Sequence, residues 1–469
     1  MTSEITPEAG DGPEQESPKP DAQEHPASWK SKMVEWLQFI RSTMVNAVII
    51  GAIIAILVFT AKDIWRQPVI IEKFGLPPML TERGFSGAVT AQRVWDAMTV
   101  IQREAGTLKR TQSLLAESRQ LDVVEPGTGL SLRSLTQMLR SLAGIEQTRI
   151  AGEFVCAEET CDWGQLSLRL RVFTEGRMYI VNSGPVADRE PDELFRESAL
   201  AALKIIDPYV YAAYLFAKDD SQIETAVEIA NELVDTNHDQ SAWAANLLGN
   251  YAQGQGRHEE AIEWFDRSIL IAKDIGPRKF ALPHYGRGNS LLALKKHELA
   301  LEAFAQAIGY DKNYASPHYG KGQTLMAMKD FTKAADAFRV ASELDRRNAA
   351  HWAGLGDAMK QLEDPVDALK NLERAVRLNA SFVPARLALG RLLVEQEDLD
   401  AARRHLKIVI TLQPDNVQGW DAFAMTYSML GEDDKEEDAL KKAAEIRVSR
   451  IGKFGSKIFA DIGWMVPDL

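Results

Sequence analysis

The chain holds two cysteines, Cys156 and Cys161, whose thiols are the most reactive side chains that the sequence places close together. Four residues separate them, a spacing that permits a loop-closing disulfide where the two Cα atoms approach to about 6 Å. Two reduced cysteines of a cytosolic protein fit the same spacing, so both interpretations stay open. No histidine lies between His25 and His238, which argues against a tetrahedral metal site or a Cys–His nucleophile in this region.

Other residues that suggest chemistry have simpler explanations. His284 and His318 recur in Pro-His-Tyr-Gly, 34 residues apart, so we interpret them as equivalent packing positions rather than as joint metal ligands. Gly320–Thr324 lacks the preceding glycine of a phosphate-binding loop. Scattered carboxylates do not define an acid/base pair without a demonstrated geometry. The sequence therefore predicts no catalytic residue, no metal site and no cofactor, and we expect a protein that is not an enzyme.

An internal repeat determines the elements of the C-terminal half. Glycines recur at intervals of 34 residues, at Gly288, Gly322, Gly356 and Gly390. Each is followed twelve residues later by alanine, at Ala300, Ala334, Ala368 and Ala402. Four residues beyond each alanine stands a large apolar residue, at Phe304, Phe338, Leu372 and Leu406. Small residues let helix backbones approach closely and the large residue fills the gap one turn later, so the period predicts packed helix pairs.

This pattern resembles the tetratricopeptide repeat family, and more specifically its membrane-anchored bacterial members. The resemblance covers Ser241–Ile446 in six units, with a degenerate unit before them, so we expect a repeat array over residues 208–446. In the last unit the large apolar position falls on Leu440, and Glu436 stands where a small residue belongs. We therefore expect residues 447–469 to form a capping helix and tail.

The resemblance implies a right-handed solenoid whose concave groove, lined by the first helix of each pair, holds peptides or partner helices. The positions of this chain that match the groove are Trp243, Asn246, Asn250, Tyr285, Asn289, Tyr319, Gln323, Asp357 and Arg391. Three amides in register, Asn250, Asn289 and Gln323, offer donors and acceptors to an extended peptide backbone. The competing interpretation is that these amides only solubilise the surface.

A small α+β domain is predicted over residues 81–207. Val89, Val94, Met98 and Ile101 have helical spacing, and a second helix is expected over Leu130–Leu142. From Thr148 the period shifts toward two, and Leu166–Phe173 followed by Arg177–Val181 reads as a hairpin turning at Gly176. A helix from Asp192 to Ile206, entered through Pro191, ends the domain.

The N-terminal region predicts a membrane anchor behind a disordered tail. Residues 1–28 are rich in acidic residues and proline and hold too few apolar side chains for a core. Within the anchor region 29–66, residues 44–61 form an uncharged run long enough to span a bilayer as a transmembrane helix. Small residues at Ala47, Gly51 and Ala55 form a stripe through which two copies of the helix are expected to associate as a homo-oligomer.

Charge and anchor together set the expected location and partners. Lys and Arg number 54 against 67 Asp and Glu, a net charge of −13, which argues against general nucleic-acid binding. Basic residues flank both sides of the anchor, so the positive-inside rule gives no orientation. A short tail inside and a long body outside is the simplest arrangement. We therefore expect a single-pass inner-membrane protein with a periplasmic body.

The sequence thus predicts a mainly α protein with a disordered tail, one transmembrane helix, a small α+β domain and a C-terminal tetratricopeptide-repeat solenoid. The resemblance implies a tethered scaffold that binds protein or peptide partners in bacterial envelope assembly, secretion or chaperoning. The alternative is a ligand-sensing protein that acts through the 81–207 domain.

Overall fold

The computed structural model describes residues 69–82, 84–107, 114–116, 147–155, 165–185, 191–218, 220–274 and 280–461, with short stretches between 33 and 50 and between 138 and 144. By its internal contacts the chain divides into two units. One comprises residues 1–69 and 119–148, and its described residues are mostly helical. The other comprises residues 70–118 and 149–469 and contains the sheet and the helix pairs described below.

The described strands form a five-stranded sheet with the order β2-β1-β3-β4-β5. They are β1 (Val69–Ile71), β2 (Leu114–Ala116), β3 (Arg149–Val155), β4 (Ser167–Thr174) and β5 (Arg177–Ser183). β4 pairs antiparallel with both β3 and β5, whereas β1 runs parallel to β3. Glu175 and Gly176 have φ values of 50° and 68°, as a two-residue hairpin turn requires. The predicted strands and their hairpin are confirmed.

Helices cover one face of this sheet. They are α3 (Gly87–Glu104) and α5 (Pro191–Ile206), of which α5 packs on β4 and β5 and α3 packs on α5. The short helix α2 (Pro78–Glu82) precedes α3 along the chain. Alternation along β4 buries Leu168, Leu170 and Val172 beneath α5. On the opposite face, Glu153 forms ion pairs with Arg171 at 2.5 Å and Arg169 at 3.5 Å.

The apolar stripe of α3 differs in one residue from the sequence expectation. Val94, Met98 and Ile101 are fully buried, whereas Val89 is 47% exposed. Val94 lies five positions after Val89, and at about 100° per residue this places the two side chains on different faces. Thr90 occupies the buried position in place of Val89.

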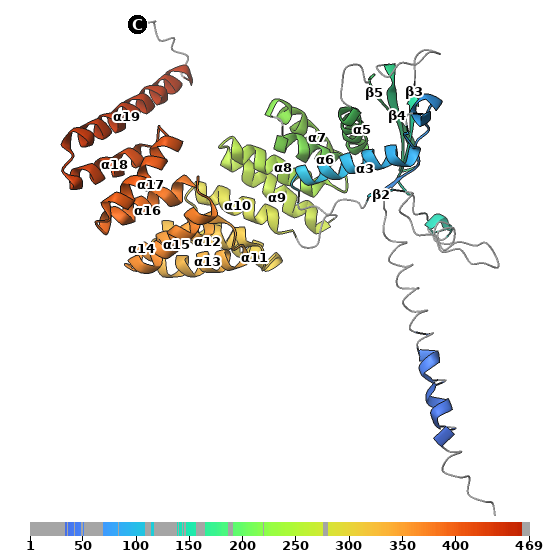
Figure 1. Ribbon diagram of the computed structural model, residues 1–469, viewed down its shortest axis with the longest axis horizontal. Helices are drawn as coiled ribbons and strands as arrows, with labels where there is room; N and C mark the ends of the chain where they lie inside the picture. The colour runs from blue at the N-terminus through green and yellow to red at the C-terminus, as the bar shows by residue number, and fades with distance from the viewer. Residues whose placement is uncertain are drawn as a thin grey trace, which may run out of the picture. The chain divides into compact units, whose positions relative to one another are not determined.

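The chain from Pro208 onward folds into helix pairs that follow one another along the chain (Figure 1). Within the described residues the pairs are α6 (Pro208–Lys218) with α7 (Ile223–Asp235), α8 (Ser241–Gly254) with α9 (His258–Asp274), α10 (Ala281–Ala293) with α11 (His297–Tyr310), α12 (Ala315–Ala327) with α13 (Phe331–Leu344), α14 (Ala349–Gln361) with α15 (Pro365–Leu378), α16 (Val383–Glu395) with α17 (Leu399–Leu412), and α18 (Val417–Leu430) with α19 (Asp433–Asp461). A short 3-10 helix, Asp220–Gln222, precedes α7. We call the first helix of each pair A and the second B. Each A helix contacts its own B helix and the A helix of the next pair, so the array is a helix-pair solenoid.

Glycine and phenylalanine interlock at the centre of each early pair. A Cβ atom on Gly288 would lie 2.6 Å from Cε1 of Phe304, and one on Gly320 would lie 2.5 Å from Cζ of the same ring. Phe304 therefore occupies the space left by a glycine of its own A helix and by a glycine of the next A helix. The same arrangement holds for Phe265 with Gly249 and Gly286, and for Phe338 with Gly322 and Gly354.

In the later pairs the B-helix residue is smaller than phenylalanine, and the A-helix residue of the next pair is larger than glycine. The B-helix position holds Leu372 and Leu406, and the A-helix position equivalent to Gly320 holds Ala388 and Ala422. Leu372 and Leu406 are fully buried, as are the phenylalanines of the earlier pairs, apart from Phe338 at 2%. Phenylalanine with glycine and leucine with alanine are thus two solutions for one volume, as close packing requires.

The turns inside the pairs repeat as well. Among the described residues, a left-handed residue precedes each B helix from α9 to α19: Gly256, Lys295, Lys329, Glu363, Glu397 and Gly431. After three of these turns an aspartate caps the B helix. The side chains of Asp330, Asp364 and Asp398 each accept a hydrogen bond of 3.1 to 3.2 Å from the backbone N–H three residues later. The caps fix where each B helix begins.

The C-terminal end differs from the sequence expectation in two ways. α19 runs without a break from Asp433 to Asp461, so no separate helix begins at Arg447. No proline stands between Asp433 and Asp461 to stop it. Leu440 is 47% exposed rather than buried. Its counterparts in the other pairs lie against the following A helix, and no such helix follows α19 in the described part of the chain.

Several expectations fall outside the described residues. These are the tail 1–28, most of the run 44–61 with Gly51 and Ala55, most of the helix expected over Leu130–Leu142, and both Cys156 and Cys161. Ala47 lies in a described helical stretch. A search of the described helices finds none with the length and apolar character needed to cross a membrane.

Candidate functional site

Three amides mark one face of the A helices. Asn250, Asn289 and Gln323 each follow the glycine that packs against the aromatic ring of its pair, so each is rotated about 100° away from that contact. Asn250 and Gln323 are exposed and Asn289 is half-buried. None of the three side chains hydrogen-bonds to another described residue. Their donors and acceptors are therefore available to a partner.

Asp357 and Arg391 continue the same position onto α14 and α16. We call the surface formed by Asn250, Asn289, Gln323, Asp357 and Arg391 the A-helix face. The A helices that carry these residues are in contact in sequence order, so the five side chains follow one another along the array. The face is amide-rich in the early repeats and charged in the later ones.

The carboxyl group of Asp357, the acid of this face, has a raised pKa. Desolvation raises its pKa to about 6, and the nearby Lys360 and Arg391 offset only part of that effect. Lys360 also forms an ion pair with Glu395, 2.6 Å from Nζ to Oε1. The later part of the A-helix face thus presents charges of both signs, which suit polar or charged side chains of a partner.

The two predicted groove tyrosines are half-buried and pack between repeats. The ring of Tyr285 lies 6.1 Å from Phe304 and 5.5 Å from Tyr314, and the ring of Tyr319 lies 5.3 Å from Phe338. Desolvation, with the Asp357 carboxylate, raises the pKa of the Tyr319 hydroxyl. These tyrosines pack against rings of neighbouring helices, so they stabilise the array in addition to their expected role in binding.

Trp243 and Asn246 are packed against other residues rather than exposed as Asn250 is. The ring of Trp243 packs between Tyr209, at 6.0 Å, and Phe280, at 4.3 Å. Asn246 is only 5% exposed, and its Oδ1 atom has no hydrogen-bond partner. Repeat register alone places both residues near Asn250, but it does not show that the residues after α3 lie beside Asn246 and help to cover it.

That cover creates a cavity which the sequence analysis did not anticipate. It has a volume of about 170 Å³ and is lined by residues of α6, α8 and α10 together with Ala105, Gly106 and Thr107, which follow α3. Asn246 and Asn250 both line it. The α+β region thus contributes one wall at the start of the A-helix face.

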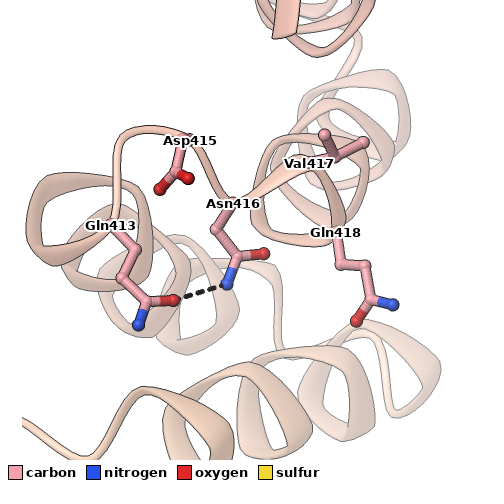
Figure 2. A pocket seen from close by; sticks show the side chains of 5 residues that line it. All are labelled: Gln413, Asp415, Asn416, Val417 and Gln418. Atoms are coloured by element: carbon pink, nitrogen blue, oxygen red, sulfur yellow. Dashed lines mark hydrogen bonds between the residues drawn. The ribbon is translucent and has the colours of Figure 1, made fainter. Parts of the chain in front are cut away.

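A second depression lies at the turn between α17 and α18 and is lined by Gln413, Asp415, Asn416, Val417 and Gln418 (Figure 2). Its volume is about 380 Å³. Nδ2 of Asn416 donates to Oε1 of Gln413 at 2.9 Å, and Oδ1 of Asn416 accepts the N–H of Gly419 at 2.9 Å. Because these groups shape the turn and cap α18, we interpret the depression as part of the scaffold.

Helix packing accounts for the two motifs that the sequence analysis judged not to be functional, the repeated histidine and the stretch Gly320–Thr324. His284 stacks on Tyr310 at 5.0 Å and its Nδ1 lies 3.0 Å from Oε1 of Gln306. Burial lowers the pKa of this histidine. Gly320–Thr324 lies within α12, where the Thr324 hydroxyl donates to the Gly320 carbonyl at 2.8 Å. The prediction that this stretch is helical rather than a phosphate-binding loop is confirmed.

Comparison with known proteins supports the repeat assignment. Sequence models described as tetratricopeptide repeat match residues 221–274, 285–349, 319–381 and 360–425. A search of curated proteins finds no significant match.

Several solved structures are similar to parts of the chain. The crystal structure of YrrB, described as a TPR protein with an unusual peptide-binding site, is 26% identical over 41% of this chain and 97% of its own, with a TM-score of 0.32. PilF of Pseudomonas aeruginosa is 18% identical over 45% of this chain and 98% of its own, with a TM-score of 0.40. The Cut9–Hcn1 assembly of the APC/C is 19% identical over 54% and 49%, with a TM-score of 0.46. Taken with the interlocked glycines and aromatic rings, the sequence matches show tetratricopeptide repeats within residues 221–274 and 285–425.

Proposed function

We propose that this protein is a non-enzymatic scaffold that binds an extended segment of a protein partner along the A-helix face. The observation that carries the proposal is the row of unpartnered amides, Asn250, Asn289 and Gln323, on successive A helices. An amide offers one donor group and one acceptor, which match the N–H and C=O of an extended peptide. The charged positions Asp357 and Arg391 then select among side chains of the segment.

Photo-crosslinking in the native cell tests this proposal. A photoreactive residue replaces Met425, which is 56% exposed and occupies the same repeat position on α18. The triple variant Asn250→Ala, Asn289→Ala, Gln323→Ala is expected to reduce the crosslinked product at least about tenfold, since each lost hydrogen bond contributes roughly 0.5–1.5 kcal/mol. Asn313→Ala, an exposed amide in the loop before α12, is the matched control and leaves the product unchanged. Equal crosslinking by the triple variant would contradict binding on this face.

We further propose that residues 44–61 tether the scaffold to the inner membrane with its body in the periplasm, where it serves envelope assembly, secretion or chaperoning. The uncharged run supports the tether, because it is long enough for a bilayer core. Tethering raises the local concentration of the scaffold for partners at the same membrane.

The redox state of Cys156 and Cys161 reports the compartment. A maleimide–polymer reagent added to lysed native cells is expected to shift the chain on a gel only after reduction, since disulfides persist in oxidising compartments. Modification without prior reduction would place the body on the cytoplasmic side. A Cys161→Ser variant, which leaves one thiol unpaired, is the positive control and reacts in both conditions.

A further inference from the structure

The cavity at the start of the A-helix face has walls of a definite chemistry. Its larger apolar residues are Tyr209, Phe216, Leu247 and Leu282, and none of the residues that line it is charged. Its volume of about 170 Å³ equals the liquid volume of roughly five to six water molecules at about 30 Å³ each. The space therefore suits one neutral, largely apolar group.

Two amide side chains of the cavity wall, Asn246 and Asn250, have no hydrogen-bond partner among the described residues, and of the two Asn246 is the buried one. The hydroxyl groups of Tyr209 and Thr107 hydrogen-bond to each other, and the backbone N–H of Tyr209 donates to Oε1 of Gln240 at 2.9 Å. Oδ1 of Asn246, in contrast, is buried and accepts no hydrogen bond, although its side chain belongs to the cavity wall. A buried acceptor without a donor destabilises the folded chain. A ligand that donates a hydrogen bond to this acceptor therefore gains more binding free energy from it than from a hydrogen bond to a solvent-exposed acceptor.

We propose that this cavity receives the indole ring of a tryptophan side chain from the bound partner segment. An indole has a broad apolar surface and one N–H donor, and it brings no acceptor that would itself need a partner. Hydroxyl and amide side chains offer little apolar surface to Phe216, Leu247 and Leu282, and lysine or arginine brings a charge that no lining residue neutralises. The N–H of the indole donates to Oδ1 of Asn246, and its ring lies against Leu247 and Phe216.

This assignment rests on the proposed function for its occupant. Asn250 is both a wall of the cavity and the first amide of the A-helix face, so a segment that follows the amides reaches the cavity at its end. The residues after α3 close this end, which gives the α+β region a part in recognition. A tryptophan seated there fixes the register of the segment against the amides.

Titration of the purified full-length chain with indole and with 1-methylindole, followed by ligand-observed NMR, tests the assignment. The two probes share the ring system, but 1-methylindole has no N–H. Indole is expected to bind about tenfold more tightly, and Asn246→Leu is expected to abolish the difference. Asn313→Leu, in the exposed loop before α12 and outside the cavity, keeps the difference. Equal affinities of the wild-type chain for both probes, or no binding of either, would overturn the proposal.

Two further variants separate a folding defect from a loss of recognition. Asn246→Leu removes an unpaired buried acceptor, so its melting temperature is expected to rise rather than fall. Ala217→Phe fills the cavity from its exposed rim and is expected to block both probes without disturbing the core. The probes do not reach Asn289 or Gln323. A double variant, Asn289→Ala with Gln323→Ala, leaves the cavity wall intact. Loss of crosslinking in this double variant without indole binding by the wild type refutes the cavity alone, and indole binding with unchanged crosslinking refutes the partner face.

Discussion

At Asp357, on the A-helix face, ionisation of a desolvated carboxyl lowers the free energy of unfolding. Its carboxyl has an ordinary pKa of 3.8 when the chain is unfolded, and a pKa of about 6 in the folded state. The folded chain therefore holds a proton that the unfolded chain has lost between about pH 4 and pH 6. Stability falls as the pH rises through this window, and the loss reaches about 3 kcal/mol above it.

The variant Asp357→Asn is neutral at every pH and is expected to escape this loss. Its free energy of unfolding should gain about 2–2.5 kcal/mol on the wild type between pH 4 and pH 7.5, as measured by urea denaturation. Glu343→Gln, on the exposed surface of α13, is the control and should follow the wild type at both pH values. A constant difference between Asp357→Asn and wild type across this range would show that the carboxyl is not perturbed by burial.

The repeat register predicts the positions of the exposed amides but not the surroundings of their neighbours. Asn250, Asn289 and Gln323 are accessible because the residue after each buried glycine turns away from the B helix. Trp243 and Asn246 belong to the same register, yet Tyr209, Phe280 and the residues after α3 cover them. Tyr209 and Phe280 belong to neighbouring helix pairs, whereas the residues after α3 lie outside the repeat pattern, so no periodicity in the sequence predicts their part of the cover.

At the scale of elements, one residue of a B helix and one residue of the next A helix together fill the space between neighbouring helix pairs. Phe338 of α13 meets Gly354 of α14, where a Cβ atom would lie 2.8 Å from the ring. In the next interface the equivalent residues are Leu372 and Ala388. The pairing explains why the chain changes both residues together rather than one alone.

A double-mutant cycle tests this coupling. Gly354→Ala is expected to destabilise the chain by about 1–3 kcal/mol through overpacking, and Phe338→Leu by about 1 kcal/mol through a cavity. The double variant reproduces the Leu372–Ala388 solution and should lose less than the sum of the two, with a coupling of at least about 1 kcal/mol in urea denaturation. Additive losses would mean that the two residues fill independent spaces.

The elements that the sequence predicts well are those with strong local signals. The hairpin of β4 and β5 follows from alternation and a left-handed turn, and the helix pairs follow from small and large residues at fixed spacing. Leu440 differs because its burial would require a following A helix, which lies beyond any local signal. The length of α19 differs because the end of a repeat pattern is not a signal that ends a helix.

At the scale of the larger unit, the sheet and the first repeats form one packed structure rather than two separate domains. Asp207 alone separates α5 from α6, and its Oδ1 accepts the N–H of Val210 at 3.2 Å. α3 packs on both α5 and α6. Nη2 of Arg196 on α5 bonds to Tyr214 on α6 at 2.5 Å and to Glu104 on α3 at 3.1 Å. The sequence places a domain boundary at residue 207, but these contacts cross it.

Because each repeat contacts mainly its neighbours, removal of one whole repeat should leave a foldable array whose stability depends on the new interface. Deletion of residues 315–348 brings Phe304 against Gly354, which reproduces the phenylalanine–glycine pair of the native interfaces. Deletion of residues 349–382 also removes 34 residues, but it brings Phe338 against Ala388. The second deletion is therefore expected to be less stable by about 1–3 kcal/mol.

Urea denaturation of the two deletion variants measures this difference, and Ala388→Gly in the second variant should restore most of it. The substitution returns the interface to phenylalanine against glycine, whereas Ala388→Gly in the undeleted chain should destabilise, because Leu372 then faces an unfilled space. Opposite effects of one substitution in the two backgrounds can arise only if the size of the neighbouring B-helix residue decides the fit. Equal effects in both would show that the interfaces tolerate either pairing and that the two solutions are not alternatives for one volume.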